Sequence, residues 1–400
     1  MDSQVVQAVD RKIMIFSARY LPSMGGVEFF TRNLSEELAR RGNEVIIVCL
    51  ERAEEGMDVA DDVTLASGGS VHVVRLDSWG WWRMPFIKWS GHTRRCLKEI
   101  RRNPPDSALI NTRLYGLSRL AARMMNECGL CPVLLDHGSS SIRFESALLT
   151  KVSAGVESFV TALIKRRKIA FFGISKESSA WLGHFGITSR GEINNAVDAD
   201  TFVSGASERD FRDELGIGPD TLCVVFTGRL IRDKGIDAIV DAARALEGRD
   251  DVRFVVAGAG PLEPEITKAA EDLATLTFVG RLDHGDIASL LISSDVFCLP
   301  SYSEGLPTSV LEAAACSCAL MYTRCGGVNE IIPSPEYGIV LESSDGDEVA
   351  RHVVDLADDP ARLAALKDAA ARRVRQRFSW AHTADQALEA FEVARRMNEA

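Results

Sequence analysis

Two glutamates with seven residues between them, Glu304 and Glu312, have the spacing to contact two parts of one elongated ligand. They lie in the segment 300–312, which reads PSYSEGLPTSVLE and follows the apolar run 295–299. The apolar run predicts a buried strand, and Pro307–Thr308 predicts the start of a helix. Because open α/β sheets bind ligands where a strand ends and a helix begins, the glutamates and the backbone amides between them are candidate ligand contacts. The alternative is that Glu304 caps the helix and Glu312 is an ordinary helical residue.

Two cations occupy a similar turn earlier in the same half of the chain. Arg229 and Lys234 belong to a loop that begins at Gly228, follows the predicted strand 221–227 and opens a helix. Cations at a helix N-terminus are unfavourable unless an anion such as a diphosphate lies between them. A basic turn exposed to solvent is the alternative. Gly258 marks a further close turn after the next predicted strand.

The first half of the chain begins with a predicted βαβ unit of a parallel sheet. Its strands are expected at 12–18 and 44–50, and its helix at 26–41. Gly25 and Gly26 at the helix start allow backbone amides to approach a phosphate, although a tight turn without a ligand fits them as well.

A single histidine in this half is a candidate ligand contact. His137 follows the predicted strand 132–136 and precedes a glycine and two serines. Loops at this end of a parallel strand carry ligand-facing groups, so we favour a functional role for His137 over a purely structural one.

Length and composition bound the class of protein. Four hundred residues predict two domains, and 46% hydrophobic with 26% charged residues is typical of a globular protein. The net charge of −11 argues against a nucleic-acid partner. Nine scattered cysteines predict reduced thiols rather than a disulfide framework, and Cys128, Cys131, Cys316 and Cys318 lack the companion pairs of a zinc site. With no signal-peptide pattern and no long apolar run, we expect a cytoplasmic protein.

Two segments raise the question of a membrane surface. One holds four tryptophans with interleaved cations, and the other is a basic run in an otherwise acidic chain. Both compositions suit a lipid interface. An equal alternative for the tryptophan-rich segment is packing onto the core, and an equal alternative for the basic run is a solvated helix end. The residues concerned are Trp79, Trp81, Trp82, Trp89, Lys165, Arg166, Arg167 and Lys168.

Over nearly its whole length the chain resembles the retaining glycosyltransferases of family 4. The resemblance implies the GT-B fold, α/β with two Rossmann-like domains facing across a cleft and a C-terminal helix crossing back to the first domain. We expect an acceptor-binding domain at 1–195, a nucleotide-sugar-binding domain at 196–378 and the returning helix at 379–400. The motifs that carry the resemblance are Gly25–Glu28, His137-Gly138, Asn195–Asp198 with Phe202, Gly228–Leu230, Asp233–Gly235, Gly258–Pro261, Phe278–Gly280, Pro300-Ser301, Glu304-Gly305, Glu312-Ala313, Gly326-Gly327 with Glu330, and Phe378–Trp380.

The resemblance also implies roles for the candidate residues. Arg229 and Lys234 would neutralise the donor diphosphate, Glu312 would bind the ribose hydroxyls, and Glu304 would hold the transferred sugar. His137 and the Gly25–Gly26 loop would approach from the facing domain. Glu304, His137, Arg229 and Lys234 are the expected catalytic residues. The expected donor-binding residues are Gly25, Gly26, Gly228, Arg229, Lys234, Gly258, Arg281, Glu304, Gly305, Leu306, Pro307, Thr308 and Glu312.

The expected activity is transfer of a sugar from a nucleotide-diphosphate donor, with uridine as the favoured base, to a glycan or lipid-linked acceptor in cell-surface polysaccharide synthesis. No metal or other cofactor is expected, and attachment at the inner face of the plasma membrane stays open. A sugar-nucleotide epimerase of GT-B fold and a degenerate, non-catalytic subunit are the alternatives. Ser317 and Ala319 stand where the family usually has glycine and proline, which puts the nucleotide end of the pocket in question.

Overall fold

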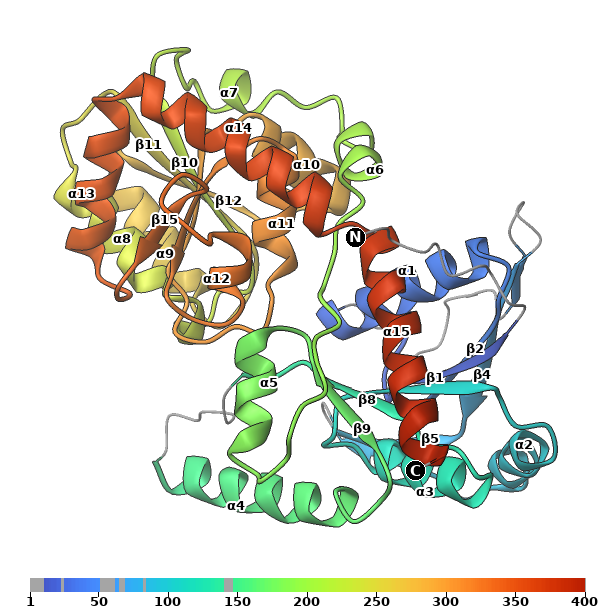
Figure 1. Ribbon diagram of the computed structural model, residues 1–400. Coiled ribbons are helices and arrows are strands. Elements are labelled where there is room, and N and C mark those ends of the chain that lie inside the picture. Colours follow the sequence, from blue (N-terminus) through green and yellow to red (C-terminus); the bar gives the residue numbers. More distant parts are fainter. Residues whose placement is uncertain are drawn as a thin grey trace. The chain divides into compact units, whose positions relative to one another are not determined.

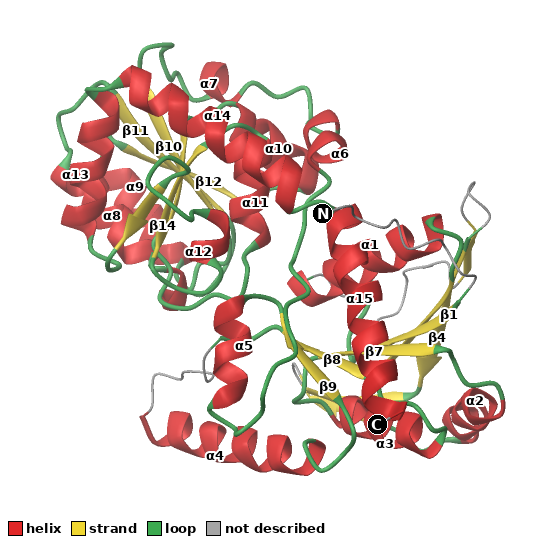
Figure 2. Cartoon of the chain, in the orientation of Figure 1, coloured by secondary structure: helices red, strands yellow, loops and turns green. Residues whose placement is uncertain are grey.

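A computed structural model describes residues 11–22, 25–50, 62–64, 69–81, 84–139 and 147–399. The chain divides into two compact units, unit 1 with Met1–Asn194 and Trp380–Ala400, and unit 2 with Asn195–Ser379. Each unit contains one large sheet with helices packed on its faces (Figures 1 and 2). The predicted α/β fold with two Rossmann-like sheets is confirmed.

The sheet of unit 1 has seven strands in the order β3-β4-β2-β1-β7-β8-β9. Neighbouring strands are parallel except β3, which is antiparallel to β4. Two further strands, β5 and β6, form a separate antiparallel hairpin. The strand bounds are β1 Lys12–Phe16, β2 Glu44–Leu50, β3 Asp62–Thr64, β4 Ser70–Leu76, β5 Ser78–Trp81, β6 Met84–Ile87, β7 Ser107–Asn111, β8 Val133–Asp136 and β9 Ala170–Gly173.

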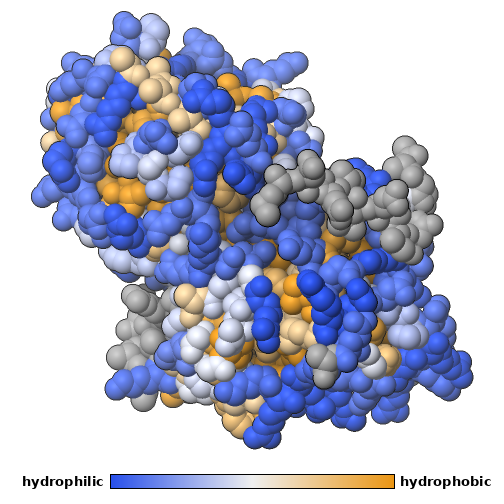
Figure 3. All heavy atoms as spheres, viewed as in Figure 1, coloured by the Kyte–Doolittle hydropathy of each residue, from blue (hydrophilic) through white to orange (hydrophobic). Residues whose placement is uncertain are grey.

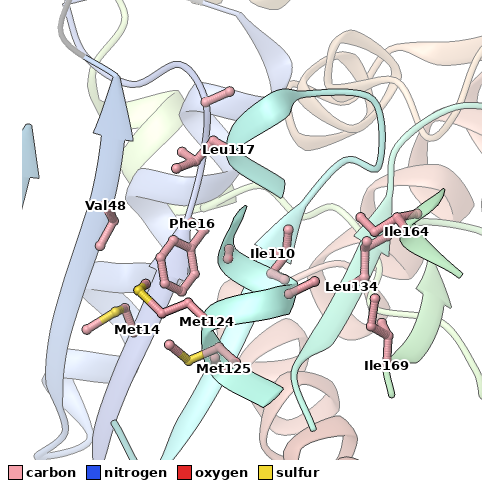
Figure 4. Packing of buried hydrophobic residues seen from close by; sticks show 14 of the residues in the cluster. Met14, Phe16, Val48, Ile110, Leu117, Met124, Met125, Leu134, Ile164 and Ile169 are labelled. Atoms are coloured by element: carbon pink, nitrogen blue, oxygen red, sulfur yellow. The ribbon is translucent and has the colours of Figure 1, made fainter. Parts of the chain in front are cut away.

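Successive side chains of the strands in unit 1 point to opposite faces of the sheet and pack into the core on each face. Met14 and Phe16 of β1 pack against Met124 and Met125 of α3 on one face (Figure 4). The helices of this unit are α1 Gly26–Arg40, α2 Gly91–Arg102, α3 Gly116–Glu127, α4 Ala147–Ile164, α5 Lys176–Gly183 and α15 Trp380–Glu399.

The last helix, α15, belongs to unit 1 although the whole of unit 2 precedes it in the sequence. It packs against α1, β8 and β9. The Trp380 ring lies 5.8 Å from that of Phe30, and Arg41 Nη1 lies 2.5 Å from Asp385 Oδ1. The C-terminal helix therefore returns to the first domain, as the resemblance implies.

The sheet of unit 2 has six parallel strands in the order β12-β11-β10-β13-β14-β15. The chain order reverses between β10 and β13, which are hydrogen-bonded neighbours. The strand bounds are β10 Leu222–Thr227, β11 Val252–Ala257, β12 Leu276–Gly280, β13 Val296–Leu299, β14 Ala319–Thr323 and β15 Ile339–Leu341.

Helices connect consecutive strands of unit 2 and cover its sheet, whose strands are buried along most of their length. Most surface atoms of both units in Figure 3 belong to hydrophilic residues, with hydrophobic residues showing in patches between them. The helices of unit 2 are α6 Ala199–Ser204, α7 Phe211–Glu214, the 3-10 turn η1 Arg232–Lys234, α8 Ile236–Ala245, α9 Glu263–Asp272, α10 His284–Ile292, α11 Thr308–Ala315, α12 Val328–Ile331, α13 Gly346–Ala357 and α14 Pro360–Arg377.

Candidate functional site

The two segments singled out in the second half of the sequence meet at the carboxyl ends of β10 and β13. The loop 228–235 follows β10, and the segment 300–307 follows β13. Since the strand order reverses between β10 and β13, the two loops flank the point where open parallel sheets bind ligands.

A buried ion pair joins the two loops. Lys234 Nζ donates to Glu304 Oε1, and both side chains are largely buried. Ser301 Oγ donates to the same carboxylate oxygen at 2.8 Å. The structure thus brings together a candidate diphosphate-binding cation and the candidate sugar-binding carboxylate.

Glycine is required at two positions that pack closely against the segment 300–307. Gly235 has φ +67°, and a Cβ added there would lie 1.8 Å from Pro300 O. Gly326 has φ +56°, and a Cβ added there would lie 2.4 Å from Glu304 O. Any side chain at either position would push the segment that carries Glu304 out of place.

Backbone and side-chain hydrogen bonds hold that segment along its length. Tyr302 N donates to Asp233 O at 2.9 Å, and Gly327 N donates to Gly305 O at 2.7 Å. Asn195 Nδ2 donates to Leu306 O at 3.2 Å. Two hydroxyl groups that the sequence did not single out also donate to it, Thr323 Oγ1 to Ser301 O and Ser344 Oγ to Pro300 O.

Helix α11 carries Glu312 away from this segment. The helix begins at Thr308 after Pro307, which confirms the predicted start, and the N-cap residue Pro307 provides no side-chain cap. Glu312 lies in its second turn, and burial raises the pKa of its carboxyl group to about 7. A hydroxyl-rich ligand that donates hydrogen bonds to Glu312 would favour the ionised form.

The remaining candidates of unit 2 lie at the same edge of the sheet. Arg229 follows β10 and Arg281 follows β12; both are exposed. Among the described residues neither has an ion-pair partner. Gly258, with φ +146°, packs against the carbonyl oxygen of Gly228, to which an added Cβ would come within 1.9 Å. The close-packed backbones of Gly228 and Gly258, with the side chains of Arg229 and Arg281, form a positively charged edge of the sheet that suits an anion.

Ser317 ends α11 in a left-handed conformation that explains why glycine is usual there. Its φ is +62°, and its N–H donates to Ala314 O at 3.0 Å. Cys318 N donates to Ala313 O at 2.9 Å, which completes a Schellman motif. Ala319 is the first residue of β14.

His137 in unit 1 is fixed by a chain of hydrogen bonds. Thr31 Oγ1 donates its single proton to Val27 O at 2.7 Å. It therefore acts as the acceptor for Asn111 Nδ2, which lies 2.8 Å away. Asn111 Oδ1 then faces His137 Nε2 at 3.0 Å, where it can only accept. We infer that His137 carries its proton on Nε2 and offers Nδ1 as an acceptor.

Burial keeps this histidine neutral. It lowers the pKa of His137 to about 3. The imidazole also packs against the Phe30 ring in a T-shaped arrangement, with the ring centres 5.2 Å apart. A neutral imidazole with so low a pKa is a weak base, so its chemistry is hydrogen bonding rather than proton abstraction. Asn111, which sets its tautomer, ends the neighbouring strand β7 and was missed in the sequence.

The Gly25–Gly26 turn opens α1 as predicted, but a carboxylate lies beside it. Gly25 is the N-cap with φ −176°, an extended conformation open to any residue. Glu28 is buried, lies near the position that a Cβ on Gly25 would take, and is 3.5 Å from Arg19 Nε. A phosphate at this helix start would therefore depend on Arg19 to offset Glu28.

Two family models match the chain. The model of Glycosyltransferase Family 4 covers residues 24–229, more than half of the sequence. The model of Glycosyl transferases group 1 covers residues 207–373. The chain belongs to glycosyltransferase family 4. The resemblance found in the motifs is thereby confirmed.

One relative of this family 4 member is a GDP-mannose-dependent monoacylated alpha-(1-6)-phosphatidylinositol monomannoside mannosyltransferase from Corynebacterium glutamicum. The two are 31% identical over 199 residues, which are 47% of this chain and 52% of that protein. The chain thus spans about half the length of this relative.

Solved glycosyltransferase structures share the fold over nearly the whole chain. Sucrose-phosphate synthase from Thermosynechococcus elongatus has a TM-score of 0.73 at 20% identity, with 96% of this chain and 98% of that one covered. HepE from Anabaena in complex with UDP-glucose has a TM-score of 0.70 at 16% identity, with 96% and 100% covered. At these identities the likeness supports the GT-B fold.

Proposed function

We propose that this family 4 glycosyltransferase moves a sugar from a nucleotide-diphosphate donor to a glycan or lipid-linked acceptor, with retention of the anomeric configuration. The observation that carries the proposal is the meeting of Lys234 and Glu304 at the carboxyl ends of β10 and β13. One group suits a phosphate and the other suits sugar hydroxyls, and both lie on rigidly held loops.

The proposed reaction breaks the bond between the anomeric carbon and the diphosphate oxygen and forms a bond to the acceptor oxygen on the same face. The acceptor proton passes to a phosphate oxygen, so no protein nucleophile takes part. Lys234, Arg229 and Arg281 would stabilise the charge that develops on the diphosphate, and we propose that this makes a metal ion unnecessary. His137 would accept a hydrogen bond from a hydroxyl group through Nδ1.

Uridine is the base that we propose, with guanosine as the alternative. The HepE structure contains UDP-glucose, whereas the corynebacterial relative is named for GDP-mannose. We propose a role in cell-surface polysaccharide synthesis in the cytoplasm. The nine cysteines are unpaired, which fits a reducing compartment.

A donor panel with an anomeric readout tests the proposal. UDP- and GDP-sugars are incubated with the full chain, with and without EDTA, and released or transferred sugar is followed by proton NMR. We expect turnover of one nucleotide series, unchanged by EDTA, with the α or β configuration of the donor kept in the first product. An inverted first product would refute retention, and loss of turnover with EDTA would refute metal independence.

A further inference from the structure

Helix α4 buries two polar side chains and exposes three large apolar ones, which is unusual for a surface helix, although Ile164 at its end is buried in the core. Its inner face includes Glu157 and Thr161, both buried. Its outer face presents Val152, Val156 and Phe159, with exposed fractions of 56%, 57% and 65%. Spacings of four and three residues place these three side chains on one stripe of the helix.

A buried arginine fixes this orientation of α4. Arg113, just after β7, donates to Glu157 Oε1 through Nη2 and to Thr161 Oγ1 through Nε at 3.1 Å. Its third contact is with Asp136, and its guanidinium carbon lies 4.5 Å from the centre of the Phe185 ring. Because a buried charge without its partners is costly, α4 cannot rotate to turn its apolar stripe inward.

Positive charge flanks the apolar stripe. Residues 165–168, the basic run that follows α4, are exposed. Lys165 and Lys168 donate to the backbone oxygens of Phe185 and Asn398, at 2.8 and 3.1 Å. The guanidinium groups of Arg166 and Arg167 have no hydrogen-bond or ion-pair partner within the described ranges of the chain, and the Arg167 backbone N–H donates to Ile164 O at 3.0 Å. Glu157 is the sole carboxylate between residues 151 and 168, and it is buried, so this surface is cationic in a chain of net charge −11.

The tryptophan-rich segment adds aromatic residues near the same helices. Its residues 78–81 and 84–87 form the β5–β6 hairpin, and Trp79 and Phe86 are exposed and stack with ring centres 5.3 Å apart. Helix α3 packs against both α4 and β6. In the described part of unit 1, the exposed large apolar side chains all lie on α4 or at 79–89. Trp82 and the side chain of Trp81 lie outside the described residues.

We propose that the outer face of α4, with residues 165–168 and the exposed aromatic residues of the β5–β6 hairpin, binds the surface of an anionic lipid bilayer. An apolar stripe beside cations, with aromatic residues nearby, matches the acyl and headgroup layers of such a surface. Within the described ranges, no helix has the length and hydropathy to span a bilayer. The inference is independent of the donor and the acceptor.

Vesicle flotation tests the proposal. The full chain is mixed with vesicles of phosphatidylcholine alone or with 30% phosphatidylglycerol, for wild type, the triple variant V152S/V156S/F159S and the double variant R166Q/R167Q. We expect wild type to bind the anionic vesicles, the double variant to bind them about tenfold less, and the triple variant to lose binding. The serine substitutions barely change helix propensity, so α4 should stay folded, as circular dichroism will check.

The control is I292S, which removes an exposed isoleucine of unit 2 and should bind as wild type does. Wild-type binding that is equal on neutral and anionic vesicles, or unchanged in the triple variant, would overturn the proposal. So would a wild-type dimer that the triple variant converts to a monomer while neither binds vesicles, because the stripe would then be covered by a second copy of the chain.

Discussion

Lys234 and Glu304 form an ion pair between the loops that follow β10 and β13, and Ser301 donates to the same oxygen of Glu304. The pair places a cation and a carboxylate within contact of each other although 70 residues separate them in the sequence. A ligand bound here would meet both groups at once.

Replacing each partner should have different effects on binding and turnover. K234A removes a charge-assisted contact to the diphosphate and should weaken nucleotide binding about tenfold or more. E304Q leaves Lys234 without a competing carboxylate, so the nucleotide should bind at least as tightly, while kcat falls about a hundredfold. Calorimetry and initial rates measure both. K268A, at an exposed lysine of α9, is the control. Equal loss of nucleotide affinity in E304Q and K234A would contradict separate roles.

The hydrogen bond between Asn111 and His137 should set the tautomer of the imidazole. In wild type, nitrogen-15 NMR should show His137 neutral and protonated on Nε2 from pH 5 to 8, because its pKa is about 3. N111L should give a mixture of tautomers and a lower kcat, with KM for the donor little changed. A protonated imidazolium at pH 6 in wild type, or an unchanged tautomer in N111L, would refute this role.

Glu312 should make the protein less stable as the pH rises towards neutrality. Its pKa in the folded protein is about 7, whereas an unfolded glutamate titrates near about 4.3. The folded state therefore binds the proton more tightly, and the resulting stability is full below pH ~4.3 and lost as the pH rises through 7. E312Q should thus gain melting temperature relative to wild type between pH 5 and 8. E336Q, at an exposed glutamate of the same unit, should show no such trend.

S317G should stabilise unit 2. A left-handed conformation costs a non-glycine residue about 1–2 kcal/mol, and glycine removes this cost. The greater conformational freedom of glycine in the unfolded chain offsets part of the resulting stabilisation. We expect a net gain of about 1 kcal/mol in the free energy of unfolding, measured in urea. S293G is the matched control, because Ser293 ends α10 at φ −77° and gains nothing from glycine there. Destabilisation by S317G would mean that its hydroxyl group has a role that the Schellman motif does not explain.

The local patterns of the sequence were sufficient for the fold and for the loops of the site. Alternating apolar runs and helical stripes predicted the parallel sheets, and polar residues directly after strands, such as Arg229 and Glu304, are found at the expected edge. These inferences need only the neighbours of each residue in the chain.

Contacts between distant segments could not be predicted in this way. Ser344 donates to Pro300 O across 44 residues, and Asn111 fixes His137 across 26. No local pattern distinguishes such a hydroxyl or amide from an ordinary polar residue. The outward apolar face of α4 was missed for the same reason, because it depends on the buried pairing of Glu157 with Arg113.

Calorimetric titration of wild type and R229A with UDP and GDP tests the donor site most directly. We predict that wild type binds UDP more tightly than GDP and that R229A weakens this binding by about 1.4 kcal/mol, or tenfold. Tighter binding of GDP would mean that guanosine rather than uridine is the base of the donor, and the proposed donor site would stand. Failure of wild type to bind either nucleotide would contradict the account and favour a degenerate, non-catalytic member of the family.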